Sequence, residues 1–222
     1  TVRRLCHGST AVRVLVNMWS YLGGDYYGGF LQQIINKYYK NVSPNLPFIY
    51  HTSRCDPELK YHTTTKTQEE LLLHVITALV HNGAFLLVDA INPDGSIVPE
   101  VYHDIMKGIY SKTSQYEKYI TGKLDHDAAI WFATHAKYDP NETKIDVREK
   151  SFEPKYFLEG PLNAAKTLRE NNIPFEVIGS KNIRGEKAGV MILSHVANIR
   201  EEEMDDIEAY VKAGGNLLIS GP

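Results

Sequence analysis

The chain has 222 residues, of which 43% are hydrophobic and 23% are charged, and its formal net charge is −3 at pH 7. This composition is typical of a globular domain and argues against a disordered chain or a strongly basic nucleic-acid binder. Because no run of about 18 apolar residues occurs, a membrane span is also excluded, and the length accommodates one to two domains.

The two cysteines, Cys6 and Cys55, are too few for the disulfide framework of a small secreted domain. The first residues are partly basic but lack the uninterrupted apolar core of a signal peptide. We therefore expect a reducing compartment and a cytoplasmic location.

Three strand–loop–helix units are predicted in the first part of the chain. The strands are expected at 13–19, 47–52 and 84–89, and the helices at 30–39, 68–81 and 99–119. A Gly-rich loop at 21–29 follows the first strand, and the third strand, apolar on both faces, is typical of a buried parallel strand. Such units predict one parallel sheet with helices outside it, either a small open sheet or the closing part of an eight-fold barrel.

A polar stretch at 120–127 marks a predicted boundary, beyond which the pattern restarts. Strands are expected at 128–132, 175–178, 189–193 and 216–219, and helices at 160–171 and 200–213. This order indicates a doubly wound α/β domain of flavodoxin-like type. The acidic start of the last helix, Glu201 to Glu203, is interpreted as a solvated helix start that complements the helix dipole.

The stretch 66–95, KTQEELLLHVITALVHNGAFLLVDAINPDG, resembles the end of the barrel in α-L-fucosidases of glycoside hydrolase family 29. The shared features are a helix, a Gly, an apolar strand and a Pro-Asp-Gly turn, although this chain has Asp89-Ala90-Ile91-Asn92 where the family's strand ends in Asn. The stretch 160–221 resembles the trimerisation domain that follows the barrel in family 42 β-galactosidases. The same order of the two parts recurs in bacterial glycosyl hydrolases.

The resemblance implies a fold class and a domain organisation. Residues 1–120 are expected to form the C-terminal strands and helices of a TIM-type (β/α) barrel. Residues 127–222 are expected to form a flavodoxin-like, class I glutamine amidotransferase-like domain. Because the chain begins almost at a strand and ends just after one, we expect it to be an internal part of a longer protein.

The resemblance also implies an activity: hydrolysis of a glycosidic bond by two carboxyl groups, without a cofactor. The implied partners are a carbohydrate substrate and further copies of the chain in a dimer or trimer, with no nucleic acid and no membrane. The family's nucleophile lies on an earlier barrel strand and has no match here. A non-catalytic carbohydrate-binding or oligomerisation protein derived from a glycosidase is the alternative.

Active sites of (β/α) barrels lie at the carboxyl ends of the strands. By that rule the candidate catalytic carboxylates are Asp25 and Asp89. The candidate sugar-binding residues at the same strand ends are Trp19, Tyr21, His51, Arg54, Asp56 and Asn92. Asp25 is alternatively a solvated loop acid. Arg54 either contacts a substrate oxygen, lowers the pKa of a catalytic carboxyl, or forms a structural pair with an Asp of its loop.

The sequence supports no metal or nucleotide site. Its nine histidines include no H-E-x-x-H pattern, and neither C-x-x-C nor a Gly-rich phosphate loop occurs. A nucleophilic serine is not expected either, because Ser194 lacks the flanking glycines of a nucleophile elbow.

Overall fold

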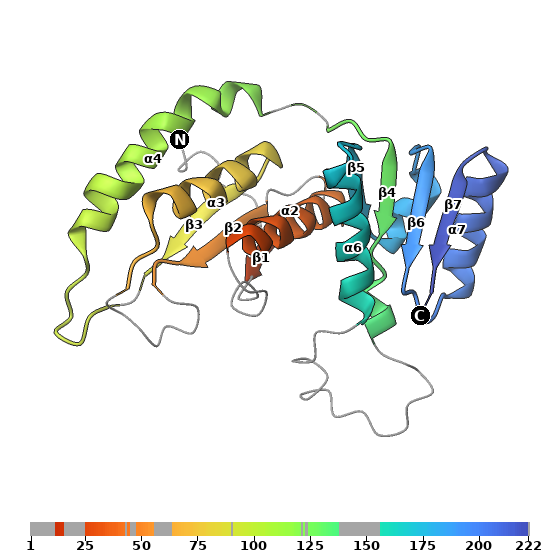
Figure 1. Cartoon of the computed structure of the whole chain (residues 1–222), viewed down its shortest axis with the longest axis horizontal. Coiled ribbons are helices and arrows are strands. Elements are labelled where there is room, and N and C mark those ends of the chain that lie inside the picture. The colour runs from red at the N-terminus through yellow and green to blue at the C-terminus, as the bar shows by residue number, and fades with distance from the viewer. Residues whose placement is uncertain are drawn as a thin grey trace, which may run out of the picture. The chain divides into compact units, whose positions relative to one another are not determined.

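The computed structural model describes residues 12–15, 25–42, 44, 48–55, 64–89, 91–120, 122, 124–137 and 156–221, of which 12–15, 25–31 and 156–157 are described by their backbone alone. The chain divides into two compact units, Thr1–Lys123 and Leu124–Pro222. Each unit is built on a parallel sheet with helices packed against it (Figure 1). The predicted mixed α/β class with parallel sheets is therefore confirmed.

The sheet of unit 1 contains three described strands in the order β1-β2-β3, all parallel. They are β1 (Val12–Leu15), β2 (Phe48–Ser53) and β3 (Ala84–Val88). Helix α2 (Asp25–Val42) joins β1 to β2, and α3 (Gln68–Val80) joins β2 to β3. These two connections are the crossovers that parallel strands require.

The segment after β3 is helical, but it changes type along its length. A π-helix (Val101–Met106) runs into α4 (Lys107–Thr113) and then into a 3₁₀-helix (Ser114–Tyr119). The sequence predicted one helix over 99–119, because apolar periodicity does not distinguish an α-turn from a wider π-turn. π-helical turns occur frequently at functional sites.

The core of unit 1 lies between the sheet and its helices. Phe48 and Tyr50 of β2 pack with Leu71 and Val75 of α3 and with Ile109 of α4. The start of α3 is capped by Thr67, whose hydroxyl accepts a hydrogen bond from the Glu70 N–H. The helix therefore begins directly after Thr67, and its buried face packs against the sheet.

The sheet of unit 2 has four described strands in the order β5-β4-β6-β7, all parallel. The strands are β4 (Ala128–Trp131), β5 (Phe175–Ile178), β6 (Val190–Ser194) and β7 (Asn216–Ser220). Helix α6 (Tyr156–Glu170) leads to β5, and α7 (Glu201–Lys212) leads to β7. Short 3₁₀-helices follow β4 (Thr134–Lys137) and β5 (Ser180–Gly185).

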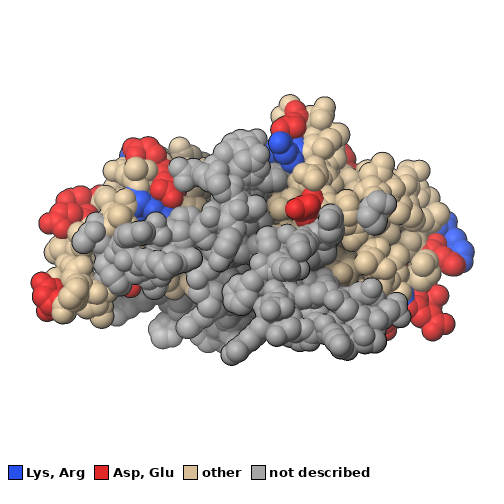
Figure 2. Space-filling model, turned by 60° about the horizontal axis from the view of Figure 1, so that its bottom comes forward, with Lys and Arg blue, Asp and Glu red and all other residues tan. Residues whose placement is uncertain are grey.

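The central strand β4 is buried along its whole length, and Trp131 at its end is part of the core of unit 2 with Met191, Ile207 and Tyr210. The Tyr210 hydroxyl donates a hydrogen bond of 2.7 Å to the Ala188 carbonyl. On the surface, acidic and basic side chains lie close together, as Figure 2 shows. Such exposed pairs contribute little to stability.

Three expectations about local structure are wrong. Asp25 begins α2 instead of lying in a Gly-rich loop, because the helical periodicity extends back through the glycines to an acidic residue that suits a helix start. β3 is not buried on both faces: among the described strands it pairs with β2 alone, and Leu86 is 47% exposed. Glu203 is not solvated but buried in unit 2.

Candidate functional site

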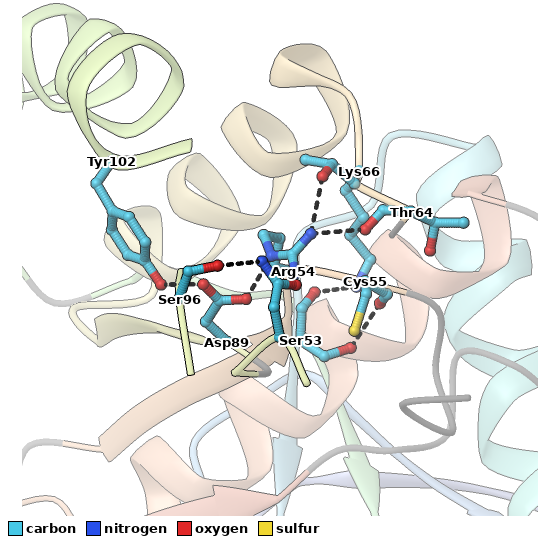
Figure 3. Close-up of polar contacts among 10 residues, drawn as sticks. Ser53, Arg54, Cys55, Thr64, Lys66, Asp89, Ser96 and Tyr102 are labelled. Carbon is cyan, nitrogen blue, oxygen red and sulfur yellow. Dashed lines mark hydrogen bonds and ion pairs between the residues drawn. The ribbon is translucent and has the colours of Figure 1, made fainter. Parts of the chain in front are cut away.

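Polar side chains gather at the carboxyl ends of β2 and β3 in unit 1 (Figure 3). In the parallel register, Ser53 at the end of β2 lies opposite Val88 at the end of β3. The next residue of each strand, Arg54 and Asp89, therefore leaves the same edge of the sheet beside the other. The Arg54 N–H donates to the Val88 carbonyl at 2.7 Å, which extends the pairing by one residue.

Asp89 is held on both of its carboxylate oxygens. Arg54 donates from Nε to Oδ1 in an ion pair, and the Tyr102 hydroxyl donates to Oδ2 at 2.6 Å. The Arg54 side chain is 0% exposed and that of Asp89 is 10% exposed. The neighbouring guanidinium and the hydrogen bond from Tyr102 both favour the ionised form of this carboxyl group over the protonated form.

Arg54 also binds the loop that leads into α3. Its Nη1 donates to the Thr64 carbonyl at 2.9 Å and to the Thr65 hydroxyl at 3.0 Å. The Lys66 N–H in turn donates to the Arg54 carbonyl at 2.9 Å. One buried guanidinium thus joins the ends of two strands to the loop at 64–66.

Lys66 is a second buried cation of this cluster. Its Nζ donates to the Thr52 hydroxyl at 2.8 Å and to the Ser53 carbonyl at 2.6 Å. The Ser53 hydroxyl donates to the Cys55 carbonyl at 2.8 Å, which fixes the turn after β2. No sequence pattern singles out Lys66, since it lies beyond the strand end in a polar loop.

Tyr102 belongs to the π-helix and, like Lys66, is not among the site residues predicted from the sequence. Burial, and then the hydrogen bond to Asp89, raise the pKa of the Tyr102 hydroxyl to about 12. The hydroxyl therefore keeps its proton at neutral pH and acts as a donor. Its aromatic side chain is half-buried, which leaves part of the ring accessible.

Two of the predicted site residues, Arg54 and Asp89, are thus brought into contact. Asn92 lies a few residues further, in a turn where its N–H donates to the Ser96 carbonyl at 2.9 Å and its Nδ2 to the Ser96 hydroxyl at 3.1 Å. His51 lies within β2, between Leu15 of β1 and Leu86 of β3 in the register.

The remaining candidates are not placed beside this cluster. Asp25 is the first residue of α2 and is described by its backbone alone. Trp19, Tyr21 and Asp56 lie outside the described residues. The interpretation that Arg54 forms a structural pair with Asp56 of its loop therefore concerns a residue outside the described part of the chain.

Within the described ranges, no three His, Cys, Asp or Glu side chains gather as a metal-binding group. In the same part of the chain, no helix has the length and apolar character needed to cross a membrane.

Solved structures of glycoside hydrolases share this fold. An α-L-fucosidase (isoenzyme 2) from Paenibacillus thiaminolyticus matches with a TM-score of 0.65 at 18% identity, over 91% of this chain and 28% of that one. A β-galactosidase from Rahnella sp. R3 matches with a TM-score of 0.66 at 14% identity, over 95% of this chain and 32% of that one. A GH42 exo-carrageenase from Bacteroides ovatus matches with a TM-score of 0.56 at 11% identity, over 86% and 26%.

The chain thus spans less than a third of the length of each of these enzymes. At such identities the likeness shows the fold. No protein-family model matches the sequence, and no curated protein matches it.

Proposed function

We propose that the chain is part of a glycoside hydrolase, in which unit 1 supplies the last strands of a (β/α) barrel and part of its sugar-binding site. The observation that carries this proposal is the polar cluster of Arg54, Asp89 and Tyr102 at the carboxyl ends of two parallel strands. In (β/α) barrels this edge holds the active site. The fold shared with a fucosidase, a galactosidase and an exo-carrageenase supports the assignment.

The cluster also narrows the role of Asp89. Glycoside hydrolysis needs one carboxyl group that carries a proton to the leaving group and one ionised carboxylate that acts as nucleophile or base. Arg54 and Tyr102 favour the ionised form of Asp89, so its environment does not suit a proton donor. Asp89 is therefore an ionised group that orients Arg54 and Tyr102 beside the sugar, or the ionised member of the catalytic pair.

Asp25 remains the other candidate catalytic carboxylate. As the first residue of α2 it stands where the helix dipole also favours a negative charge. Because the surroundings of Asp25 and Asp89 both favour the ionised form, the proton donor is expected to be a third carboxyl group.

Direct contacts to the sugar are assigned to the groups that solvent reaches. Arg54 is fully buried and hydrogen-bonded to protein groups. Its geometry therefore supports a role in holding the Asp89 carboxylate and does not support direct contact with the substrate. The half-buried ring of Tyr102 and the amide of Asn92 lie nearer the surface. Aromatic ring faces and amides are the usual partners of sugar C–H faces and hydroxyls.

Unit 2 is proposed to be a flavodoxin-like domain that packs subunits together in a dimer or trimer. Its strand order, β5-β4-β6-β7, corresponds to the order 2-1-3-4 with which the flavodoxin-like sheet begins. The molar mass in solution, measured by light scattering coupled to gel filtration, tests this part of the proposal. A strictly monomeric mass would contradict the assembly role.

Hydrolysis of nitrophenyl α-L-fucoside, β-D-galactoside and related glycosides tests the catalytic proposal, with calorimetric titration of the free sugars beside it. We expect one sugar to bind, and Asp89→Asn to weaken that binding and any turnover. Asp104→Asn, an exposed carboxylate of the π-helix, is the matched control and should change neither.

The alternative, a carbohydrate-binding protein without catalysis, is favoured by the fact that both oxygens of Asp89 are engaged. Saturable sugar binding that depends on Asp89, together with no turnover of any glycoside, would select it. A folded protein that neither binds nor cleaves any sugar would overturn both forms of the proposal.

A further inference from the structure

A second polar cluster lies in unit 2, at the end of β4, and contains none of the residues assigned to the candidate site of unit 1. Its members are Trp131, the last residue of β4, His135 of the following 3₁₀-helix, and Glu203 in the first turn of α7. The rings of Trp131 and His135 have centroids 6.2 Å apart, and His135 Nε2 lies 3.2 Å from Glu203 Oε2. His135 thus contacts both of the other side chains.

The position of the cluster in the sheet is that of a ligand site. β4 and β6 are neighbours, but the chain leaves β4 toward β5 on one side and leaves β6 toward β7 on the other. Figure 1 shows these two strands side by side. Parallel sheets bind ligands at the carboxyl ends of strands where the connections diverge in this way. His135 follows β4 and Glu203 follows β6, so the two residues face each other across this point.

Two of the three side chains carry a buried polar atom that has no hydrogen-bond partner among the described residues: Trp131 Nε1 and Glu203 Oε1. Trp131 is 0% exposed and Glu203 is 2% exposed. Buried polar atoms in native proteins are nearly always hydrogen-bonded, because an unpaired group loses its hydration without compensation. Two such atoms, on side chains that both contact His135, therefore indicate a missing partner.

The second oxygen of Glu203 is used within the fold. Glu203 Oε2 accepts a hydrogen bond of 2.9 Å from the Arg200 N–H and so closes the start of α7. This contact fixes the carboxylate and leaves Oε1 as the available acceptor. Trp131 Nε1–H can only donate, and the His135 ring nitrogen can donate or accept according to its tautomer.

From these observations we infer that this cluster binds a small molecule bearing hydroxyl groups. A hydroxyl oxygen of this molecule accepts a hydrogen bond from Trp131 Nε1–H, and the proton of the same hydroxyl is donated to Glu203 Oε1. A hydroxyl is the group that satisfies a fixed donor and a fixed acceptor at once. His135, whose side chain is 16% exposed, is the most accessible of the three. Unit 2 would then carry a polyol or sugar site of its own beside its role in packing.

The indole N–H signals of the ¹⁵N-labelled protein provide the test. Its two tryptophans, Trp19 and Trp131, give two signals, and a Trp19→Phe sample serves to assign them. Glycerol and D-galactose are the probes. We expect the Trp131 signal to shift saturably with at least one of them, with an affinity at least fivefold weaker in Glu203→Gln.

Glu202→Gln, an exposed neighbour in the same helical turn, is the matched control and should leave the affinity unchanged. If Glu203→Gln does not fold, His135→Asn takes its place, and we expect this second variant to weaken binding as well. An unmoved Trp131 signal with both probes would overturn the inference, and so would equal affinities in the Glu203 and Glu202 variants. An indole proton that shows contact with a long-lived water but no response to either probe would mean an ordered water only, which also overturns it.

Discussion

The Tyr102 hydroxyl donates a 2.6 Å hydrogen bond to Oδ2 of Asp89, so the π-helix is joined to the end of the strand that precedes it. The side chain of Asp89 is 10% exposed and is paired with Arg54 on its other oxygen. The carboxylate is therefore shared between a cation on the neighbouring strand and a phenol thirteen residues further along the chain. This relationship ties the proposed sugar site to a helix type that is uncommon in proteins.

Tyr102→Phe should destabilise unit 1 by about 1–3 kcal/mol, because a hydrogen bond to a charged, buried acceptor is lost while the ring stays in place. Urea unfolding followed by circular dichroism measures the change. Tyr116→Phe, an exposed residue of the following 3₁₀-helix, is the control and should have an effect near zero. Equal stabilities of the two variants would show that the Tyr102 hydroxyl contributes nothing to the fold.

The Arg54–Asp89 pair should behave as a coupled buried pair. Arg54→Met alone is expected to cost about 3–5 kcal/mol, because it leaves a buried carboxylate without its cation. The double variant Arg54→Met/Asp89→Asn should recover part of that loss, since the uncompensated charge is gone. A thermodynamic cycle of the four proteins gives the coupling energy. Strictly additive losses would mean that the two side chains do not support each other.

Much of the fold could be predicted from the sequence, because strands and helices follow local apolar patterns. The run 175–178 forms β5 with the expected bounds, and α3 begins at Gln68 as expected. The buried face of α3 is harder to predict. Ile76 and Val80 are apolar but exposed, whereas the polar His74 is buried against Tyr50 of β2.

The candidate site could be predicted in part. The rule that active residues follow parallel strands selects Arg54 and Asp89, but their contact depends on the register that sets Ser53 opposite Val88. The register depends on how the two strands pair, and the sequence of neither strand alone determines it. Tyr102 and Lys66 reach the cluster from a π-helix and a loop, whose geometry no local pattern reveals.

The interpretation of Glu203 shows a different limit. A triplet of glutamates at a helix start reads as solvated, and Glu201 and Glu202 are indeed exposed. The third is buried because the helix periodicity turns it toward the sheet, one turn before Ile207 of the core. The charge pattern alone could not separate the third glutamate from the other two.

Stability should fall as the pH is lowered from about 6.5 to about 4. Burial lowers the pKa of both His74 and His81 to about 4, from the ordinary value of 6.5 in the unfolded chain. Between these values the unfolded state binds more protons, so protonation favours unfolding. His74 is fixed by a 2.6 Å hydrogen bond to Gln32, and its ring stacks on Tyr50.

Unfolding free energies measured at several pH values test this dependence. His74→Gln should flatten the slope between pH 6.5 and 4, whatever its effect on stability at pH 7.5. His103→Gln, at an exposed position of the π-helix, should leave the slope unchanged. A His74 variant with the slope of the parent protein would contradict the assignment of a neutral, buried imidazole.

Two glycines of unit 1 should respond to alanine with opposite signs. A Cβ on Gly83 would lie 2.2 Å from the ring of Phe48, which is itself buried in the core, so the ring or the backbone must move. Overpacking of this kind costs about 1–3 kcal/mol.

Gly108 lies inside α4, and its Cβ would meet only Gln68 Nε2, at 3.6 Å. Gly108→Ala should therefore stabilise the helix by up to about 1 kcal/mol. Thermal unfolding of the two variants side by side measures both effects. A Gly83→Ala protein as stable as its parent would mean that Phe48 has room to turn away from β3.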